Sequence, residues 1–563
     1  MGISELWRII SPGGKKFTLE QLSYDRSLKS NGKGLRVAID VALWVFQARS
    51  STVGDQSELR ALFFRLCRLY ELGIRPVFVF DGPQRPEYKR NRLINTTPID
   101  TEFRRNLITL IRFFNFAIWH SYGEAEAECA LLQRLGFVDV VFTGDSDVFL
   151  FGARRVVRNW PIKRNDPVLC YDLTWITDST GLDRSDLILI ALLHGSDYDT
   201  KGAKGIGINV AAQLAKCHFH RELMDDIQLT KRNGPLDDER VRHLFDDLTY
   251  ELHHNSTKNL SRKHTSVALD PKFLEFSIMM DFIHPQTNIE NTKNDQGMLT
   301  KINQLQNQLD YHHEPNWPLL APFAQEAFKW PAEYLLRRFS SLLFHGYMAN
   351  RLRRIIRRHD HNYRPTLSIQ QSSSNSSEYS NRQTTLQEYY VSTTRHHYAS
   401  TTVRDVVKIT GTKIVSDDLK FFRVEWDPSC YQKFIDQLKP NLNYDEALYE
   451  NIKLSQQGTM DLEEQLTDSQ QQENKKEKKD VWTLIKRQWV HATSLYCRYP
   501  DVVQHYQRQQ KKKSSIRVQK NCDSKAQSSV RVQRISENSK TQTLTNISQY
   551  MTKLYIPPRA KLF

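Results

Sequence analysis

Four short apolar runs organise the first 150 residues, and each has the composition of a buried strand. The runs occupy residues 35–40, 75–80, 116–120 and 138–142. Each ends in, or leads into, an acidic residue: Asp40, Asp81, Glu124 and Asp145. Chance does not readily explain four successive strands with a carboxylate at the C-terminal end.

Helical patterns separate these runs. Residues 41–46 have the pattern of a packed helix, and Glu58 to Leu72 carries apolar residues at helical spacing, which completes a β-α-β unit. A helix predicted over Ser185 to Leu193 leads into Asp197. This order predicts an α/β fold with a mostly parallel sheet flanked by helices.

Seven acidic residues are expected at one edge of this sheet, because parallel strands joined by right-handed crossovers end on the same side. They are Asp40, Asp81, Glu124, Glu126, Asp145, Asp147 and Asp197. Mutual repulsion would raise their pKa values unless cations neutralise them, and oxygen ligands favour Mg²⁺ or Mn²⁺. Two such ions roughly 3.5–4 Å apart support phosphodiester hydrolysis. Any one acid could instead cap a helix or lie in an exposed loop.

Three glutamates crowd the start of the segment that begins at Gly123. Inside one helix, Glu124 and Glu128 share a face, whereas Glu124 and Glu126 point apart. Glu124 and Glu126 can converge only if Glu124 lies at the helix start, and Gly123 before it suits such a start.

The chain has 563 residues, a net charge of +15 and 11% aromatic residues. The length predicts two or three domains, and the charge favours a polyanionic partner such as nucleic acid; a basic surface kept for solubility is the alternative. The 7 cysteines form no CxxC pair, which argues against a zinc site and favours a reducing compartment. No signal peptide or membrane-spanning run is apparent, which predicts a soluble intracellular protein with no membrane partner.

Six linked segments resemble the motifs of the flap endonuclease and XPG nuclease superfamily. In order within residues 1–216 they are MGISELW, IDVALWVF, VFVFDG, YGEAEAECA, TGDSDVFLFG and HGSDYDTKGAKGIG. The resemblance implies a Rossmann-like (PIN-like) sheet in which all seven acids are catalytic metal ligands, and it selects Glu124 and Glu126 over Glu128. The implied cofactors are two Mg²⁺ ions, for which Mn²⁺ can substitute.

The resemblance also implies contacts with DNA. Gly202 to Ala215 looks like the family's helix-two-turn-helix, which holds a duplex arm and commonly a K⁺ ion. Lys89 falls where relatives use a lysine to steer the scissile phosphate, although a solvated lysine is the alternative. Phe46 can stack on a nucleobase or pack in the core. The implied DNA-contacting residues are Gly2, Phe46, Arg85, Arg90, Arg92, Lys201, Lys204, Gly205 and Gly207.

The branch that this chain resembles most is the eukaryotic, fungal-type Holliday junction resolvases with a C-terminal chromodomain. The implied divisions are an XPG N-terminal region (1–120), an XPG internal region (121–216) with the helix-two-turn-helix at 202–216, a helical extension (217–358), a flexible linker (359–402), a chromodomain-like module (403–508) with an insertion at 441–479, and a basic disordered tail (509–563).

Several local predictions fall within the C-terminal half and the extension. Residues 231–263 are expected to be a loop, and 315–354 to form two helices with a basic end usable against DNA phosphates. Residues 403–426 predict two or three strands, and 480–507 predict an amphipathic helix with its extension. Phe421, Phe422 and Trp426 either cage methyl-lysine or pack in the module, and of the roles open to the module an extra contact with a DNA arm is preferred.

The implied function is that of a magnesium-dependent, structure-specific endonuclease in the nucleus. It would cut four-way junctions by symmetric paired nicks as a homodimer, and also cut 5′ flaps and fork-like branches, in recombination and repair. The alternatives are a monomeric 5′-flap endonuclease and an inactive junction-binding scaffold; the complete set of acids argues against the scaffold. Gln383 to Tyr390, QTTLQEYY, matches the form of a sliding-clamp binding peptide, a short pattern that also recurs by chance.

Overall fold

The computed structural model describes residues 2–3, 5–29, 34–49, 57–85, 88–89, 92–93, 101–161, 166–199, 201–229, 238–270, 273–291, 296–310, 314–360, 405–416, 419–444 and 486–513. The chain divides into two compact units. The first contains Met1–Gln383 and Tyr398–Ser494, and the second contains Thr384–His397 and Leu495–Phe563. No helix in the described part of the chain is long and apolar enough to cross a membrane. The clamp-binding pattern at 383–390 lies outside the described residues.

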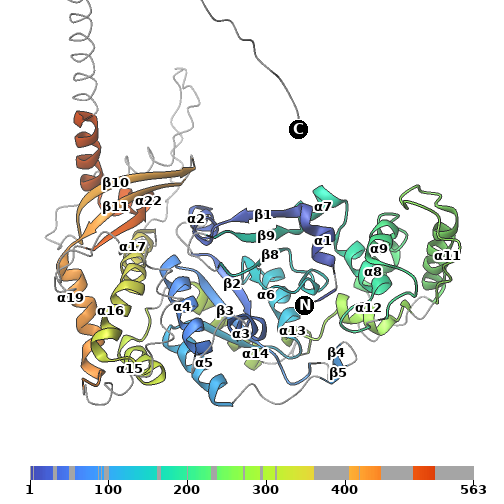
Figure 1. The fold of residues 1–563 in the computed structure, drawn as a ribbon, viewed down its shortest axis with the longest axis horizontal. Helices are drawn as coiled ribbons and strands as arrows, with labels where there is room; N and C mark the ends of the chain where they lie inside the picture. The colour runs from blue at the N-terminus through green and yellow to red at the C-terminus, as the bar shows by residue number, and fades with distance from the viewer. Residues whose placement is uncertain are drawn as a thin grey trace, which may run out of the picture. The chain divides into compact units, whose positions relative to one another are not determined.

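A seven-stranded sheet forms the centre of the first unit, in the order β1-β9-β8-β7-β2-β3-β6 (Figure 1). Its central strands β7, β2, β3 and β6 are parallel neighbours, which confirms the predicted α/β fold. Strand β8 is parallel to β7, whereas β9 pairs antiparallel with β8 and with β1. The strands are β1 (Gly14–Phe17), β2 (Arg36–Asp40), β3 (Arg75–Phe80), β6 (Ala117–His120), β7 (Val140–Phe142), β8 (Arg155–Arg158) and β9 (Val168–Asp172).

Both faces of the sheet are covered, as continuous apolar strands require. Every residue of β3 is buried. Phe78 lies 5.1 Å from Trp44 between ring centroids, on the face of α3, while Val77 and Val79 join the core that includes Ala127 of α6. The helices that accompany these strands are α1 (Leu6–Ile10), α2 (Leu19–Lys29), α3 (Val41–Arg49), α4 (Ser57–Leu72), α5 (Thr101–Phe113), α6 (Ala125–Arg134) and α7 (Leu173–Thr180).

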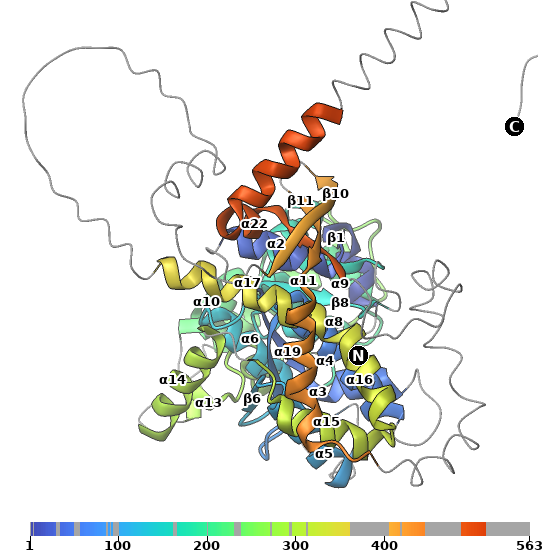
Figure 2. The same ribbon diagram turned by 90° about the vertical axis from the view of Figure 1, so that its left-hand side faces the viewer.

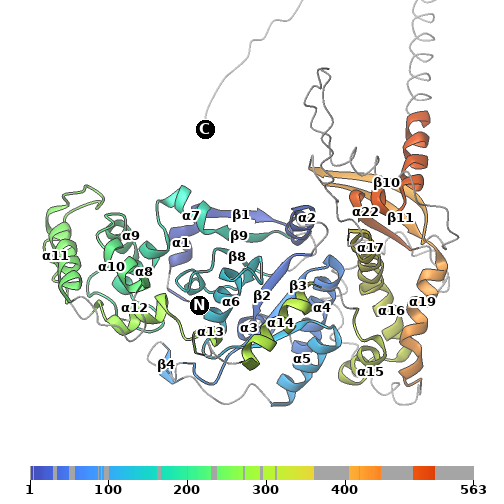
Figure 3. The same cartoon turned by 180° about the vertical axis from the view of Figure 1, so that it is seen from behind.

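A group of helices follows the seven-stranded sheet and is seen together in Figure 3. Its members are α8 (Arg184–His194), α9 (Ile208–Ala215), α10 (Arg221–Leu229), α11 (Asp238–His254) and α12 (Phe276–Ile283). The predicted loop at 231–263 is wrong over residues 238–254. Val241, Leu244 and Leu248 recur there at helical spacing, and the last two are buried within α11.

The extension contains more helices than expected. After α13 (Asn288–Asn291) and α14 (Gln296–Asp310) come α15 (Trp317–Phe328), α16 (Ala332–Leu342) and α17 (Phe344–Asp360). The prediction of two helices over 315–354 is therefore wrong. Lys329 ends α15 in the left-handed region at φ 53°, and Leu343 separates α16 from α17. Arg351, from the predicted DNA-binding end, is instead ion-paired with Asp405 at 3.0 Å.

A three-stranded antiparallel sheet lies against the extension. It contains β10 (Val406–Ser416), β11 (Leu419–Trp426) and β12 (Arg487–His491), followed by α19 (Pro428–Leu438) after β11 and α22 (Ala492–Arg498) after β12. The expected helix is wrong at Arg487–His491, because this short segment pairs edge to edge with β11. Helix α19 packs on α15 and α16 (Figure 2), with Phe434 5.3 Å from Trp317 between ring centroids.

Phe421, Phe422 and Trp426 are buried, so these rings pack in the module and are not available as a methyl-lysine cage. Whether the module is a chromodomain stays a prediction. In the second unit, residues 500–513 are helical, so helix extends over residues 509–513, which were predicted to begin the disordered tail.

Candidate active site

Acidic residues occupy the C-terminal ends of four adjacent parallel strands. Asp40 is the last residue of β2, Asp81 follows β3, and the segment after β6 leads to Glu124. Asp145 follows β7. Because these strands are neighbours in the order β7-β2-β3-β6, their acids share one edge of the sheet.

Burial and the neighbouring carboxylates both change the pKa of Asp40. Burial, together with the nearby carboxylates of Asp81 and Asp145, raises the pKa of Asp40 to about 7, although backbone hydrogen bonds act to lower it. One of those bonds runs from the amide of Ala42 to Asp40 Oδ1 at 2.9 Å. Three strand ends therefore bring their negative charges within electrostatic reach of one another.

Asp81 is tied to the start of α6. Its Oδ1 accepts a hydrogen bond from the amide of Ala125 at 2.9 Å, and the amide of Gly82 donates to the carbonyl of Gly123 at 2.8 Å. A Cβ at Gly82 would lie 2.1 Å from the carbonyl oxygen of Ser121, so this close approach requires glycine. Arg85, expected to contact DNA, lies 3.3 Å from Asp81 Oδ2.

Glu124 is the N-cap of α6, with an extended backbone at φ −79° and ψ 138°, and Glu126 lies in the first turn. Both side chains are nearly buried. The hydroxyl of Tyr198 donates to Glu124, and this connects the acids of α6 to the segment that carries Asp197. Burial, Glu124, Asp281 and Glu126 together raise the pKa of Tyr198 far above its usual value. Sequence reasoning missed Tyr198, although its position next to Asp197 could have suggested it.

Glu128 has a different environment. It is fully buried, and its two oxygens accept hydrogen bonds from Trp119 Nε1 at 2.9 Å and from the amide of Asn288 at 3.0 Å. Glu128 thereby joins α6 to the edge strand and to α13. This environment supports the choice of Glu124 and Glu126 over Glu128.

Substitution of these two glutamates is expected to separate stability from activity. Glu128→Gln should lower the free energy of unfolding by about 1–3 kcal/mol, because an NH₂ group would face one of the two buried donors. Glu126→Gln should leave folding intact and remove the nuclease activity that the family resemblance implies. Thermal unfolding and cleavage of a branched DNA substrate, measured on both variants, check this. Loss of cleavage in a fully stable Glu128→Gln protein would contradict it.

The N-terminal segment crosses the loop that carries Asp145 and Asp147. The amide of Ile3 donates to Asp147 Oδ1 at 2.9 Å, and Trp7 Nε1 donates to the carbonyl of Gly144 at 3.0 Å. Gly2 has a φ of 79°, and a Cβ there would lie 2.2 Å from Asp145 Oδ1. The structure therefore brings Gly2 to the acidic edge, where a larger residue would not fit.

The donor set fits hydrated divalent ions. Asp40, Glu124, Glu126, Asp145, Asp147 and Asp197 are buried and offer only oxygen. In the described part of the chain, no three His, Cys, Asp or Glu side chains surround one point as a closed metal cage would. Mg²⁺ keeps several waters and is commonly held by one or two carboxylates, so an open row of acids suits it.

The expected DNA-contacting residues lie on several elements. Phe46, on α3, is 62% exposed, so the packed-core alternative is wrong. Lys201 and Lys204 are exposed in the turn between α8 and α9, where Gly205 has a φ of 85° and Gly207 is the N-cap of α9. Within 202–216 the structure therefore has a turn followed by α9, while the preceding helix α8 ends at His194; the helix-two-turn-helix itself stays a prediction.

The segment between Asp81 and α5 contains a short hairpin. Its strands are β4 (Tyr88–Lys89) and β5 (Arg92–Leu93), and Lys89 pairs with Arg92 across them. Arg90 lies outside the described residues. The hairpin was not predicted, because two-residue strands leave no period in the sequence.

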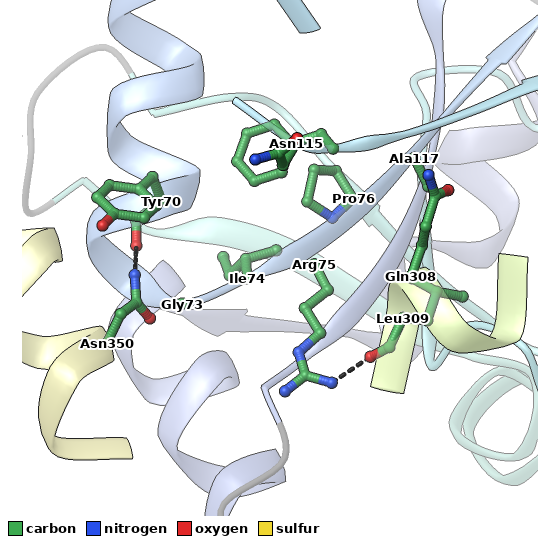
Figure 4. A pocket seen from close by; sticks show the side chains of 11 residues that line it. Tyr70, Gly73, Ile74, Arg75, Pro76, Asn115, Ala117, Gln308, Leu309 and Asn350 are labelled. Atoms are coloured by element: carbon green, nitrogen blue, oxygen red, sulfur yellow. Dashed lines mark hydrogen bonds between the residues drawn. The ribbon is translucent and has the colours of Figure 1, made fainter. Parts of the chain in front are cut away.

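A separate small cavity of about 30 Å³ lies at the opposite edge of the sheet (Figure 4). It is lined by the starts of β3 and β6, where Arg75 donates to the carbonyl of Leu309 at the end of α14. A cavity of this size holds about one water molecule. It is therefore not a second substrate site.

Comparison with known proteins gives matches over the first part of the chain. Residues 1–97 match the XPG N-terminal domain, and residues 115–197 match the XPG I-region. Flap endonuclease GEN-like 1 of Arabidopsis thaliana is 33% identical over 218 residues, which cover 34% of this chain and 36% of that protein. Flap endonuclease GEN homolog 1 of Mus musculus is 32% identical over 246 residues, 40% of this chain and 26% of that protein. The matched stretch thus spans about a third of these relatives' length.

Solved structures share the fold over a longer stretch. The Holliday junction-resolving enzyme GEN1, in complex with product DNA and Mg²⁺, superposes with a TM-score of 0.61 at 24% identity, covering 90% of this chain and 100% of that one. The junction-resolving enzyme GEN-1 with potassium gives a TM-score of 0.62 at 23% identity, with the same coverage. At this identity the likeness establishes the fold.

Proposed function

The matches of residues 1–97 and 115–197 support the XPG nuclease superfamily for this chain, and on that basis we propose that the protein is a structure-specific DNA endonuclease. Its main substrate is the four-way junction, which it resolves by symmetric paired nicks as a homodimer. It also cuts 5′ flaps and fork-like branches. The observation that carries the proposal is the row of buried acids at the ends of β7, β2, β3 and β6.

The proposed metal ligands are the seven acids: Asp40, Asp81, Glu124, Glu126, Asp145, Asp147 and Asp197. When bound, the divalent ions activate water and stabilise the charge on the phosphodiester. The raised pKa of Asp40 supports a role for such ions, since burial and the neighbouring acids disfavour its ionised form. Mn²⁺ substitutes for Mg²⁺ in this proposal.

Residues around the acids bind and orient the DNA. Ile3 and Trp7 hold the N-terminal segment over the acidic loop, which leaves Gly2 beside it. Arg85 is positioned at Asp81 and is available to a phosphate once a metal ion neutralises that carboxylate. Lys89 steers the scissile phosphate, and Arg90 and Arg92 contact the same strand. The exposed ring of Phe46 stacks on a base at the branch.

The duplex arm binds to the turn between α8 and α9. Gly205 and Gly207 let the backbone approach a phosphate, and Lys201 and Lys204 add positive charge. We place a K⁺ ion in this turn as well. The net charge of +15 favours binding of DNA throughout, and a nuclear location follows from this substrate.

The choice of substrate rests on the relatives. The solved structures of the same fold are of a Holliday junction-resolving enzyme, while the curated relatives are called flap endonucleases. A monomeric 5′-flap endonuclease is therefore the second candidate function. The inactive scaffold is disfavoured, because a scaffold gains nothing from a buried acid row that repels itself.

One assay separates these functions. The purified protein is incubated with end-labelled four-way junction, 5′-flap and linear duplex DNA, with Mg²⁺ or with EDTA. Symmetric nicks in the junction that require Mg²⁺ are the expected result. Flap cutting without paired junction nicks would establish the monomeric alternative, and binding without cleavage of any substrate would establish the scaffold.

A further inference from the structure

A folded loop, residues 255–267, lies beside the turn that we propose for the duplex arm. It follows α11 and has the sequence NSTKNLSRKHTSV, which contains two lysines and one arginine but no acid. Lys258, Arg262 and Lys263 are exposed. Among the described residues, none of these three side chains forms an ion pair. Their positive charges are therefore exposed to solvent, and no ion pair within the described residues neutralises them.

A buried glutamate fixes the start of this 255–267 loop. Glu251 is fully buried, and its carboxylate accepts hydrogen bonds from the amide and hydroxyl of Ser256 and of Thr257, with the two amides at 3.0 and 3.1 Å. Although burial raises the pKa of Glu251, these hydrogen bonds bring it below the usual value. The carboxylate is thus an internal anchor for the turn.

The rest of the loop is held with equal specificity. Asn255 Nδ2 donates to the carbonyl of Leu260 at 2.8 Å, and the amide of Leu260 donates to Asn255 Oδ1 at 3.1 Å. Asn255 and Lys258 adopt left-handed backbone conformations at φ 51° and 61°. Non-glycine residues keep such conformations where the surrounding contacts impose them. The loop therefore has one defined shape, and Lys258 is presented at a fixed place.

This loop is attached to α9. The amide of Ser261 donates to Gln213 Oε1 at 3.1 Å, and Asn259 Nδ2 donates to the carbonyl of Lys216 at 3.3 Å. On the other side, Val267 is the nearest neighbour of Gly205: a Cβ at that glycine would lie 3.6 Å from it. The loop and the turn between α8 and α9 therefore form one continuous surface.

We propose that the 255–267 loop is a second binding site for the phosphodiester backbone of the duplex arm, with Lys258, Arg262 and Lys263 as its phosphate contacts. The proposal rests on the proposed function. Positive charge without acids suits a polyanion, and a rigid loop loses little conformational entropy on binding. The neighbouring helix α11 carries the exposed acids Glu239, Asp246 and Asp247 as well as Arg240 and Arg242, so its surface is mixed in charge, unlike that of the loop.

The test replaces Lys258, Arg262 and Lys263 by alanine together in the full chain. Dissociation constants for a labelled four-way junction are measured by fluorescence anisotropy in EDTA over a range of salt concentrations. The Kd is expected to rise about tenfold at 0.1 M salt, and the slope of log Kd against log salt to fall by about 2–3, as the loss of three phosphate contacts predicts. The matched control replaces Lys16, Lys329 and Lys433, which are also exposed, and should bind as the unmodified protein does.

The Glu251→Gln variant tests whether DNA binding depends on the conformation of the 255–267 loop or only on its positive charge. This change removes a negative charge, which by charge alone would tighten binding to DNA. Loosening of the loop is expected to weaken binding instead, by about threefold to tenfold. Thermal unfolding confirms that the variant is folded.

Each outcome decides the proposal. A triple alanine variant with the Kd and salt slope of the unmodified protein would overturn it, and so would tighter binding by Glu251→Gln. If the unmodified protein binds and cuts branched DNA in either of these cases, the proposed function stands and only the role of the loop falls. If the unmodified protein neither binds nor cuts branched DNA, both fall.

Discussion

Replacing Asp145 by Asn is expected to lower the single-turnover rate of junction cleavage about a thousandfold, equivalent to roughly 4 kcal/mol of transition-state stabilisation. Asp145 is 1% exposed and follows the central strand β7. Its Oδ1 accepts the amide of Asp147 at 3.0 Å, and asparagine can keep that bond through its own oxygen. The change therefore removes negative charge at the acidic edge while leaving the loop in place.

The measurement uses enzyme in excess over labelled junction with Mg²⁺, so that the rate reports the cleavage step and not binding. Asp139→Asn is the matched control, because Asp139 precedes the same strand and pairs with Arg36 at 2.8 Å, away from the acidic edge. This control should lose some stability and keep its cleavage rate. Cleavage by Asp145→Asn at the unmodified rate would refute the assignment of the site.

The elements that carry the site were predictable because their signals are local. Strands β2, β3, β6 and β7 each contain a short apolar run, and their acids follow immediately in the sequence. Parallel pairing then brings acids that are distant in the sequence to one edge. Periodicity alone would have paired Glu124 with Glu128. That pairing fails because Glu124 is the N-cap of α6 and has an extended backbone, so helical spacing does not apply to it.

The features that were missed depend on contacts between distant segments. The hydroxyl of Tyr198 donates a hydrogen bond to Glu124, which lies 74 positions away in the sequence. Residues 487–491 form strand β12 because they pair with the edge of β11. At the Glu425–Arg487 pair the two paired residues are 62 positions apart in the sequence. Residues 255–263 were predicted only as part of a polar loop, because nothing in the sequence shows that the buried carboxylate of Glu251 fixes their conformation. Such pairings leave no pattern along the chain.

Replacing Asp40 by Asn is expected to stabilise the metal-free protein while removing its cleavage activity. The folded-state pKa of Asp40 is about 7, against an ordinary value of 3.8. Well below pH 3.8 the carboxyl is protonated in both the folded and the unfolded chain, so it does not change the free energy of unfolding. As the pH rises from 4 to 7, the unfolded chain releases the proton first and the folded state loses relative stability. Above pH 7 the loss is constant, on the order of 4 kcal/mol.

Thermal unfolding in EDTA at pH 5 and pH 8 measures this effect. The melting temperature of Asp40→Asn should exceed that of the unmodified protein at pH 8, and the gap should be smaller at pH 5. Added Mg²⁺ should raise the melting temperature of the unmodified protein at pH 8 and narrow the gap, since a bound cation removes the repulsion that asparagine also removes. Asp178→Asn, at an exposed position of α7, is the control and should melt like the unmodified protein at both pH values. A less stable Asp40→Asn protein at pH 8 would show that the buried carboxylate supports the fold and is not held there at a cost to stability.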